Sequence, residues 1–253
     1  MLKFKKNNLS ITFFVIGSIS ALVLFIILYV ASSIILFGAA PSKPVPNAVN
    51  GEDRYYLNQS YDNADPYMTK NPDLKDILAG PIISSADPGI GLKNAPVVMV
   101  QFSDFECDFC AEQEEVLKKI KEKYNDSLRI IWKDYPEPDY NSSSYAAAMA
   151  SRCAQNQGKF WEFHDFLFKN NENLNKEIFY KGAKDLGLDT YVFEACLDDQ
   201  KTRNKIDENI AEADALDIPG VPFLYINDRE IMGSLSEEEL GKIIQSELEI
   251  NEQ

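Results

Sequence analysis

Two of the four cysteines in this 253-residue chain, Cys107 and Cys110, are separated by only two residues. This spacing lets the two sulfur atoms bond to each other, and it suits thiol–disulfide exchange, in which one cysteine attacks and the second resolves the mixed disulfide. Half of a zinc site, or a purely structural disulfide, would show the same spacing. A zinc site needs more ligands, and Cys153, Cys196 and His164 show no paired spacing. The pair therefore predicts redox chemistry without a metal or other cofactor.

The residues on either side of the pair predict that the cysteines open a helix. Residues 97–102 are rich in β-branched side chains and nearly all apolar, as a buried strand would be. Residues 111–124 carry apolar side chains at helical spacing. The backbone N–H groups and the positive end of the helix dipole would favour a thiolate at Cys107, and the thiolate is the species that attacks a disulfide.

The N-terminal part of the chain differs in composition from the rest. Three lysines precede an uncharged apolar run at 11–37, which as a helix would measure about 40 Å against a hydrocarbon core of about 30 Å. A cleaved signal peptide would have a shorter apolar core and a small-residue cleavage site. We therefore predict a cytoplasmic tail at 1–10, an uncleaved single-pass transmembrane anchor at 11–37, and a proline-rich exported linker at 38–90. Residues 91–253 then form the folded domain on the extracytoplasmic side of the cell membrane.

The charge of the chain excludes some classes of partner. Forty acidic residues against 25 basic ones give a formal net charge of −15 at pH 7. Such a chain is poorly suited to nucleic acid or to anionic lipid surfaces.

The predicted export places the other two cysteines in an oxidising compartment. There Cys153 and Cys196 would either form a structural disulfide or remain two buried free thiols.

The remaining pattern predicts a strand–helix–strand unit, a helical insertion at about 142–216, and a final strand–strand–helix unit. Residues 128–132 predict a second buried strand, parallel to the first. The insertion shows helical periodicity and breaks at glycine or paired aspartates. The last unit is predicted from two strands, 223–226 and 229–232, and a helix at 236–249.

Three segments in this order resemble the DsbA-like thiol–disulfide oxidoreductases, especially the membrane-anchored branch of that family. The resemblance covers roughly residues 85–250 and implies an α/β thioredoxin fold with an inserted all-helical domain. It also implies that Cys107 is the nucleophile and Cys110 the resolving cysteine. The segments are Val97–Cys110 (VVMVQFSDFECDFC), Arg152–Phe168 (RCAQNQGKFWEFHDFLF) and Ala215–Asn227 (ALDIPGVPFLYIN).

The third segment maps Pro222 onto the cis-proline of the family, which faces the cysteines in space. A cis X–Pro bond costs little compared with other cis peptides. The preceding residue, Val221, could then pair with an extended substrate strand and hold a substrate cysteine near Cys107. The resemblance therefore implies that Val221 and Pro222 form a substrate-binding edge.

The chain departs from the pattern of the family at residues that tune redox chemistry. Asp108 and Phe109 separate the cysteines, with no histidine or proline between them, and acidic side chains surround Cys107. Like charge opposes a thiolate, so Cys107 is expected to be less acidic than in strongly oxidising relatives. Gln101 stands where many relatives carry a buried glutamate thought to move protons, and glutamine cannot titrate. His164 also matches a family position, but its aromatic, mid-helix setting favours a packed core histidine.

The leading hypothesis is a membrane-anchored enzyme that introduces disulfides into unfolded or reduced exported proteins. A membrane redox partner would then recycle Cys107 and Cys110. A reductase or isomerase of the same fold is the first alternative, because the acidic surroundings make the pair a weaker oxidant. The second alternative is a non-catalytic surface binding module that keeps the fold and structural disulfides.

Overall fold

The computed structural model describes residues 78–251. The predicted cytoplasmic tail, the predicted transmembrane anchor and most of the predicted linker lie outside the described residues. In the part of the chain that is described, no helix is both long enough and apolar enough to cross a membrane.

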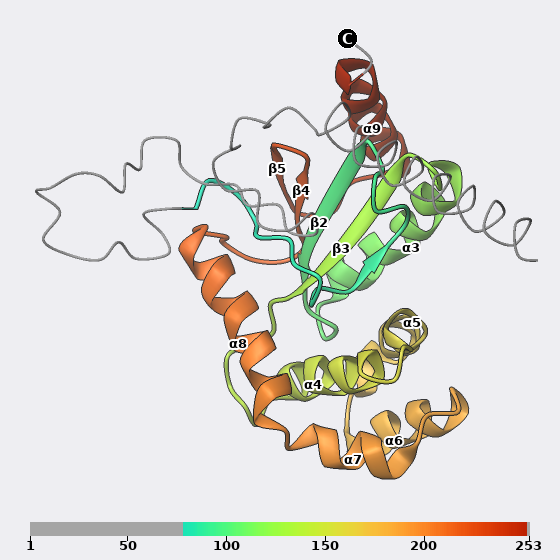
Figure 1. The fold of residues 1–253 in the computed structure, drawn as a ribbon, viewed down its shortest axis with the longest axis vertical. Coiled ribbons are helices and arrows are strands. Elements are labelled where there is room, and N and C mark those ends of the chain that lie inside the picture. The colour runs from blue at the N-terminus through green and yellow to red at the C-terminus, as the bar shows by residue number, and fades with distance from the viewer. Residues whose placement is uncertain (1–77, 252–253) are drawn as a thin grey trace, which may run out of the picture. The chain divides into compact units, whose positions relative to one another are not determined.

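A mixed five-stranded sheet forms the centre of the fold, with the strand order β1-β3-β2-β4-β5 (Figure 1). β2 pairs in parallel with β3, as the strand–helix–strand pattern predicts, and the other three pairings are antiparallel. Every residue of β2 is buried, so the strand that leads to the cysteines lies in the middle of the sheet. The strands are β1 (Gly89–Ile90), β2 (Val97–Ser103), β3 (Leu128–Asp134), β4 (Phe223–Ile226) and β5 (Arg229–Met232).

Two helices, α3 (Asp108–Lys123) and α9 (Glu237–Asn251), pack against one face of the sheet. Side chains of β2 alternate between the two faces, as a strand requires. Met99 therefore joins the cluster beneath α3 and α9, whereas Val100 joins the cluster on the opposite face. A capping box of Ser236 and Glu239 starts α9, as the sequence predicts.

Between β3 and β4 the chain forms only helices, which confirms the prediction of a thioredoxin-like α/β fold with a helical insertion. In Figure 1 the first of these helices lie together beyond one end of the sheet, and α8 leads back toward it. The helices are α4 (Ser143–Gln155), α5 (Phe160–Lys169), the 3₁₀ turn η1 (Asn171–Asn173), α6 (Lys176–Asp185), α7 (Thr190–Leu197) and α8 (Gln200–Ala215).

A buried ion pair attaches the insertion to the sheet. Arg152 of α4 contacts Asp134 at the end of β3, and both side chains are almost completely buried. Both side chains also form hydrogen bonds outside the ion pair. The other carboxylate oxygen of Asp134 accepts a hydrogen bond from the Trp132 indole at 2.8 Å, and the Arg152 guanidinium donates one to the side-chain oxygen of Asn209 of α8 at 2.8 Å. A buried charge pair with every partner in place fixes geometry, whereas removing one partner would leave an uncompensated charge.

The folded part begins earlier than the sequence pattern predicts. The prolines and asparagines before residue 91 indicate a linker, but β1 (Gly89–Ile90) pairs with β3 and Ile83 is buried. Asp87 forms a buried ion pair with Lys133 at 3.0 Å. These contacts are made across long distances in sequence and leave no local periodicity, so the sequence does not show them.

Cys153 of α4 and Cys196 of α7 form a disulfide, with 5.6 Å between their Cα atoms. The sequence left open a structural disulfide or two free thiols at these positions, and the structure contains the disulfide. The bond lies within the insertion, and the two cysteines are 43 residues apart in the sequence.

Replacing both Cys153 and Cys196 with alanine should lower the free energy of unfolding by about 4 kcal/mol, because the unfolded chain regains the freedom of a long loop. Urea unfolding of the variant and the parent protein measures the difference. A Cys107→Ala/Cys110→Ala chain, unfolded with and without reductant, is the matched control because this disulfide is then the only one that can be reduced. An unchanged unfolding midpoint in both comparisons would contradict the prediction.

Candidate active site

Cys107 is the N-cap residue of α3, at the end of the short turn that follows β2. Its sulfur accepts a hydrogen bond from the backbone N–H of Cys110 at 3.1 Å. Both cysteines are free thiols; Cys107 is half-buried and Cys110 is fully buried. Of this pair, only the Cys107 sulfur can be reached by an attacking group from solvent.

Hydrogen bonds to the Cys107 sulfur lower its pKa below the ordinary cysteine value. The thiol of Cys110 contributes most, and the backbone N–H groups of Cys110 and Phe109 add to it, while burial and the charge of Asp104 act in the opposite direction. Burial raises the pKa of Cys110 far above the ordinary value. The pair is therefore divided into a sulfur that favours the thiolate and a sulfur that stays protonated, as attack and resolution require.

The segment before β4 lies directly beside the nucleophilic sulfur. The Val221–Pro222 peptide bond is cis, and the Cys107 sulfur lies 3.8 Å from the carbonyl oxygen of Val221. The carbonyl of Pro222 accepts a hydrogen bond from the backbone N–H of Gly233 at 2.9 Å, which ties the segment to the end of β5. The structure thus brings together Cys107, Val221 and Pro222, which are far apart in the sequence.

The two residues between the cysteines form the exposed first turn of α3. Phe109 is 66% exposed, and its carbonyl accepts a hydrogen bond from the Ser234 hydroxyl at 3.0 Å. Asp108 is also exposed and accepts a hydrogen bond from the side-chain amide of Asn171 at 3.3 Å. Both side chains are thus placed where an approaching substrate would meet them.

Gln101 lies on β2 and is completely buried, with its amide nitrogen donating to the carboxylate of Glu114. Glu114 is itself buried, and its other oxygen lies 3.6 Å from the imidazole of His164. Glu114 follows Cys110 by four residues, so the two share one face of α3. No prediction from the sequence includes Glu114; its spacing from Cys110 is the signal that could have identified it.

His164 is packed among aromatic rings, as predicted, but it also has charged neighbours. Its ring stands edge-on to those of Trp132 and Phe168, with centroids 4.9 Å away in each case. Burial opposes its charged form, but the carboxylates of Glu114 and Asp165 outweigh burial and raise the pKa of His164. The histidine is therefore part of a buried polar cluster behind the cysteine pair.

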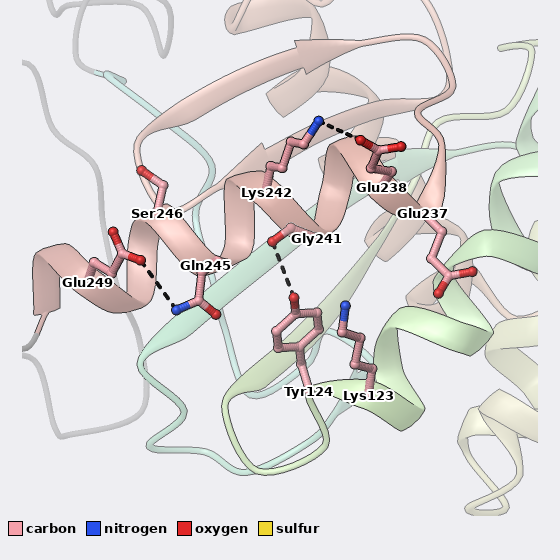
Figure 2. Close-up of a pocket in the computed structure, with 9 residues that line it drawn as sticks. All are labelled: Lys123, Tyr124, Glu237, Glu238, Gly241, Lys242, Gln245, Ser246 and Glu249. Atoms are coloured by element: carbon pink, nitrogen blue, oxygen red, sulfur yellow. Dashed lines mark hydrogen bonds and ion pairs between the residues drawn. The ribbon is translucent and has the colours of Figure 1, made fainter.

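A surface cavity between the end of α3 and α9 lies away from the cysteines (Figure 2). Its polar groups already pair with one another: the Tyr124 hydroxyl donates to the Gly241 carbonyl at 3.2 Å, and Lys242 pairs with Glu238 at 2.6 Å. Lys123 and Tyr124 mark the opposite end of α3 from the cysteine pair, so this cavity takes no part in thiol chemistry. Among the residues from 78 to 251, no group of His, Cys, Asp or Glu side chains is arranged to hold a metal ion.

Comparison with known proteins agrees with the fold. Residues 84–246 match the sequence family described as thioredoxin. The chain belongs to this family. Two curated relatives are the Na⁺/H⁺ antiporter NhaA 3 of Salinispora tropica, 30% identical over 169 residues, and the Na⁺/H⁺ antiporter NhaA of Herminiimonas arsenicoxydans, 30% identical over 165 residues. The matches cover 67% and 65% of this chain but only 26% of each antiporter, so the chain spans about a quarter of the length of these relatives.

Solved structures share the thioredoxin-like fold. The catalytic domain of Proteus mirabilis ScsC is 26% identical, with a TM-score of 0.57 over 65% of this chain and 90% of that one. The thiol-disulfide exchange protein α-DsbA2 of Wolbachia pipientis is 22% identical, with a TM-score of 0.59 over 64% and 87%. The chain is therefore a member of the thioredoxin family with a divided cysteine pair at the start of α3, which is the arrangement that thiol–disulfide exchange requires.

The buried cluster behind the cysteines can be tested through His164, which is the only histidine in the chain. Because carboxylates raise its folded-state pKa, protonated His164 stabilises the fold fully below the unfolded value of about 6.5, and this stabilisation is lost as the pH rises through the folded pKa. The single imidazole NMR titration should therefore have its midpoint above about 6.5.

Glu114→Gln should lower that midpoint. Burial lowers the pKa of His164, and the variant loses the Glu114 carboxylate that raises it. Glu115→Gln is the matched control, since Glu115 is the next residue of α3 but is exposed and paired with Lys118. A midpoint that is the same in the Glu114→Gln variant and the parent protein would show that Glu114 does not hold the imidazolium.

Proposed function

We propose that the protein forms disulfides in exported proteins, with its Cys107–Cys110 disulfide as the oxidant. The observation that carries this proposal is the hydrogen-bonded Cys107 sulfur at the start of α3. Interactions that stabilise the Cys107 thiolate stabilise the reduced enzyme, so the oxidised enzyme gives up its disulfide more readily. This favours transfer of the disulfide from the enzyme to its substrate.

The exchange takes place in two steps. A substrate thiolate attacks the Cys107 sulfur; the Cys107–Cys110 bond breaks, and Cys110 leaves and takes up a proton. A second substrate thiolate then attacks the substrate sulfur of the mixed disulfide, which forms the substrate disulfide and releases Cys107 as a thiolate. Two electrons pass from the substrate to the cysteine pair, so a redox partner must oxidise the pair again.

An extended segment of an unfolded substrate fits the surroundings of Cys107. The Val221 carbonyl lies 3.8 Å from the Cys107 sulfur, and an extended peptide that paired with the backbone there would hold its cysteine at the reactive atom. The exposed ring of Phe109 offers apolar contact on the same turn. Reduced, unfolded proteins expose both backbone and apolar side chains, which makes them the proposed substrates.

Export and membrane anchoring belong to the same proposal. The apolar run at 11–37 is long enough to span a bilayer, and the lysines before it favour a cytoplasmic N-terminus. The Cys153–Cys196 disulfide suits an oxidising compartment. The curated relatives are named as antiporters, which supports a membrane setting. The recycling partner is then a membrane redox protein on the extracytoplasmic side.

A reductase or isomerase is the second candidate function. Hydrogen bonds lower the pKa of Cys107, but burial and the charge of Asp104 limit this lowering. The raised pKa of Cys110 makes this sulfur a poor leaving group when the enzyme disulfide is attacked. Both effects favour the oxidised pair and act against an oxidase.

The purified, oxidised full-length chain should oxidise a reduced, unfolded peptide with two cysteines. Cys107→Ala should abolish the reaction. Cys110→Ala should instead accumulate a mixed disulfide when the peptide is supplied as a disulfide with a small thiol that leaves readily, because Cys107 displaces the small thiol and no second thiol resolves the bond. Equilibration with glutathione buffers should give a reduction potential well above the value of about −270 mV for thioredoxin. A potential near that value would favour the reductase, and equal peptide oxidation by the parent protein and Cys107→Ala would remove an enzymatic role for the pair.

A further inference from the structure

Residues 104–108, called the active-site turn below, contain three acidic side chains, and each of them is held by a residue of the helical insertion or of the 3₁₀ turn within it. The contacts come from the start of α4 and from η1. Each carboxylate accepts a hydrogen bond from a neutral donor: Asp104 from the Ser144 hydroxyl at 2.7 Å, Glu106 from the Ser143 hydroxyl at 2.6 Å, and Asp108 from the Asn171 amide at 3.3 Å.

These donors fix the positions of the carboxylates without cancelling their charge. Across the described residues, no ion pair joins any of the three acids to a lysine, arginine or histidine. Glu106 and Asp108 are exposed and flank Cys107 directly in the sequence. A substrate thiol therefore reaches the Cys107 sulfur through a field of fixed negative charge.

We propose that the acidic side chains of the active-site turn select substrates by charge. They favour substrate cysteines flanked by lysine or arginine and disfavour anionic thiols. The inference rests on the proposed thiol–disulfide exchange at Cys107 and adds to it the class of substrate. Groups bonded to the reacting sulfur come within a Debye length of Glu106 and Asp108, which is about 10 Å at 0.1 M salt. The attraction or repulsion therefore acts on the reacting complex and weakens as salt is added.

Small thiols of different charge test the inference directly. Cysteamine is cationic, 2-mercaptoethanol is neutral and 3-mercaptopropionate is anionic, and each reduces a disulfide by the same chemistry. The thiolate attacks the Cys107 sulfur, the bond to Cys110 breaks, and Cys110 takes up a proton; a second thiolate then releases Cys107 and forms the small disulfide.

The rate constant for each thiolate with the oxidised full-length chain is divided by that for the same thiolate with a neutral small disulfide. This ratio cancels the intrinsic nucleophilicity of each thiol. Samples are quenched with acid at successive times, and alkylation of the freed Cys110 then measures the first attack, because this step releases Cys110 while Cys107 remains in the mixed disulfide. At low salt the ratio should be about fivefold larger for cysteamine than for mercaptopropionate, and at about 1 M salt the difference should largely disappear.

A double variant, Glu106→Gln/Asp108→Asn, should remove most of the discrimination while its amides still accept hydrogen bonds from Ser143 and Asn171. The matched control is Glu237→Gln/Glu249→Gln, which removes two exposed acids beside the cavity at the far end of α3 (Figure 2). This control has the same change in net charge and should keep the full discrimination. A pair of single-cysteine peptides with lysine or glutamate on both sides of the cysteine should show the same order of rates.

The outcomes separate this inference from the function on which it rests. Equal ratios for the three thiols, or discrimination that survives in the Glu106→Gln/Asp108→Asn variant, would overturn selection by charge and leave exchange at Cys107 intact. Failure of every thiol to reduce the Cys107–Cys110 disulfide would remove the proposed function, and the charge selection with it.

Discussion

The hydrogen bond from the Cys110 backbone N–H to the Cys107 sulfur links the fold to the chemistry. The same sulfur that caps the first turn of α3 is the atom that reacts, and the N–H group that it satisfies would otherwise be an unpaired helix end. This geometry requires α3 to begin immediately after the turn that leaves β2. β2 is fully buried and lies in the middle of the sheet, which fixes the point at which that turn starts.

Three distant parts of the chain surround the sulfur, and buried contacts hold them together. The ring of Phe105, on the active-site turn, stacks on Trp132 of β3 with centroids 4.7 Å apart, and the Trp132 indole donates to the carboxylate that pairs with Arg152 of the insertion. The Val221 carbonyl oxygen, from the segment before β4, lies 3.8 Å from the Cys107 sulfur. The position of the reactive group is therefore set by long-range packing as well as by the local helix cap. This is why the insertion can contribute the residues that orient the acidic side chains of the active-site turn.

The elements were predictable from the sequence because their signals are local. Continuous apolar residues indicate β2, the cysteine pair stands at the helix start, and Ser236 with Glu239 predicts the start of α9. The partners of buried polar groups were not predictable, because pairs such as Gln101 with Glu114 join elements through space and carry no periodicity. The same limit applies to β1, a two-residue strand that only its pairing with β3 defines. The acids beside Cys107 could be recognised from sequence, whereas their neutral donors required the fold.

The central claim is that the fold makes Cys107 the reactive thiolate of the pair. The rate of alkylation of the reduced full-length chain by iodoacetamide, measured across pH with the modified cysteine identified by mass spectrometry, tests it most directly. The structure predicts modification of Cys107 alone, with a midpoint below the ordinary cysteine value. A midpoint at or above that value, or preferential modification of Cys110, would contradict the account.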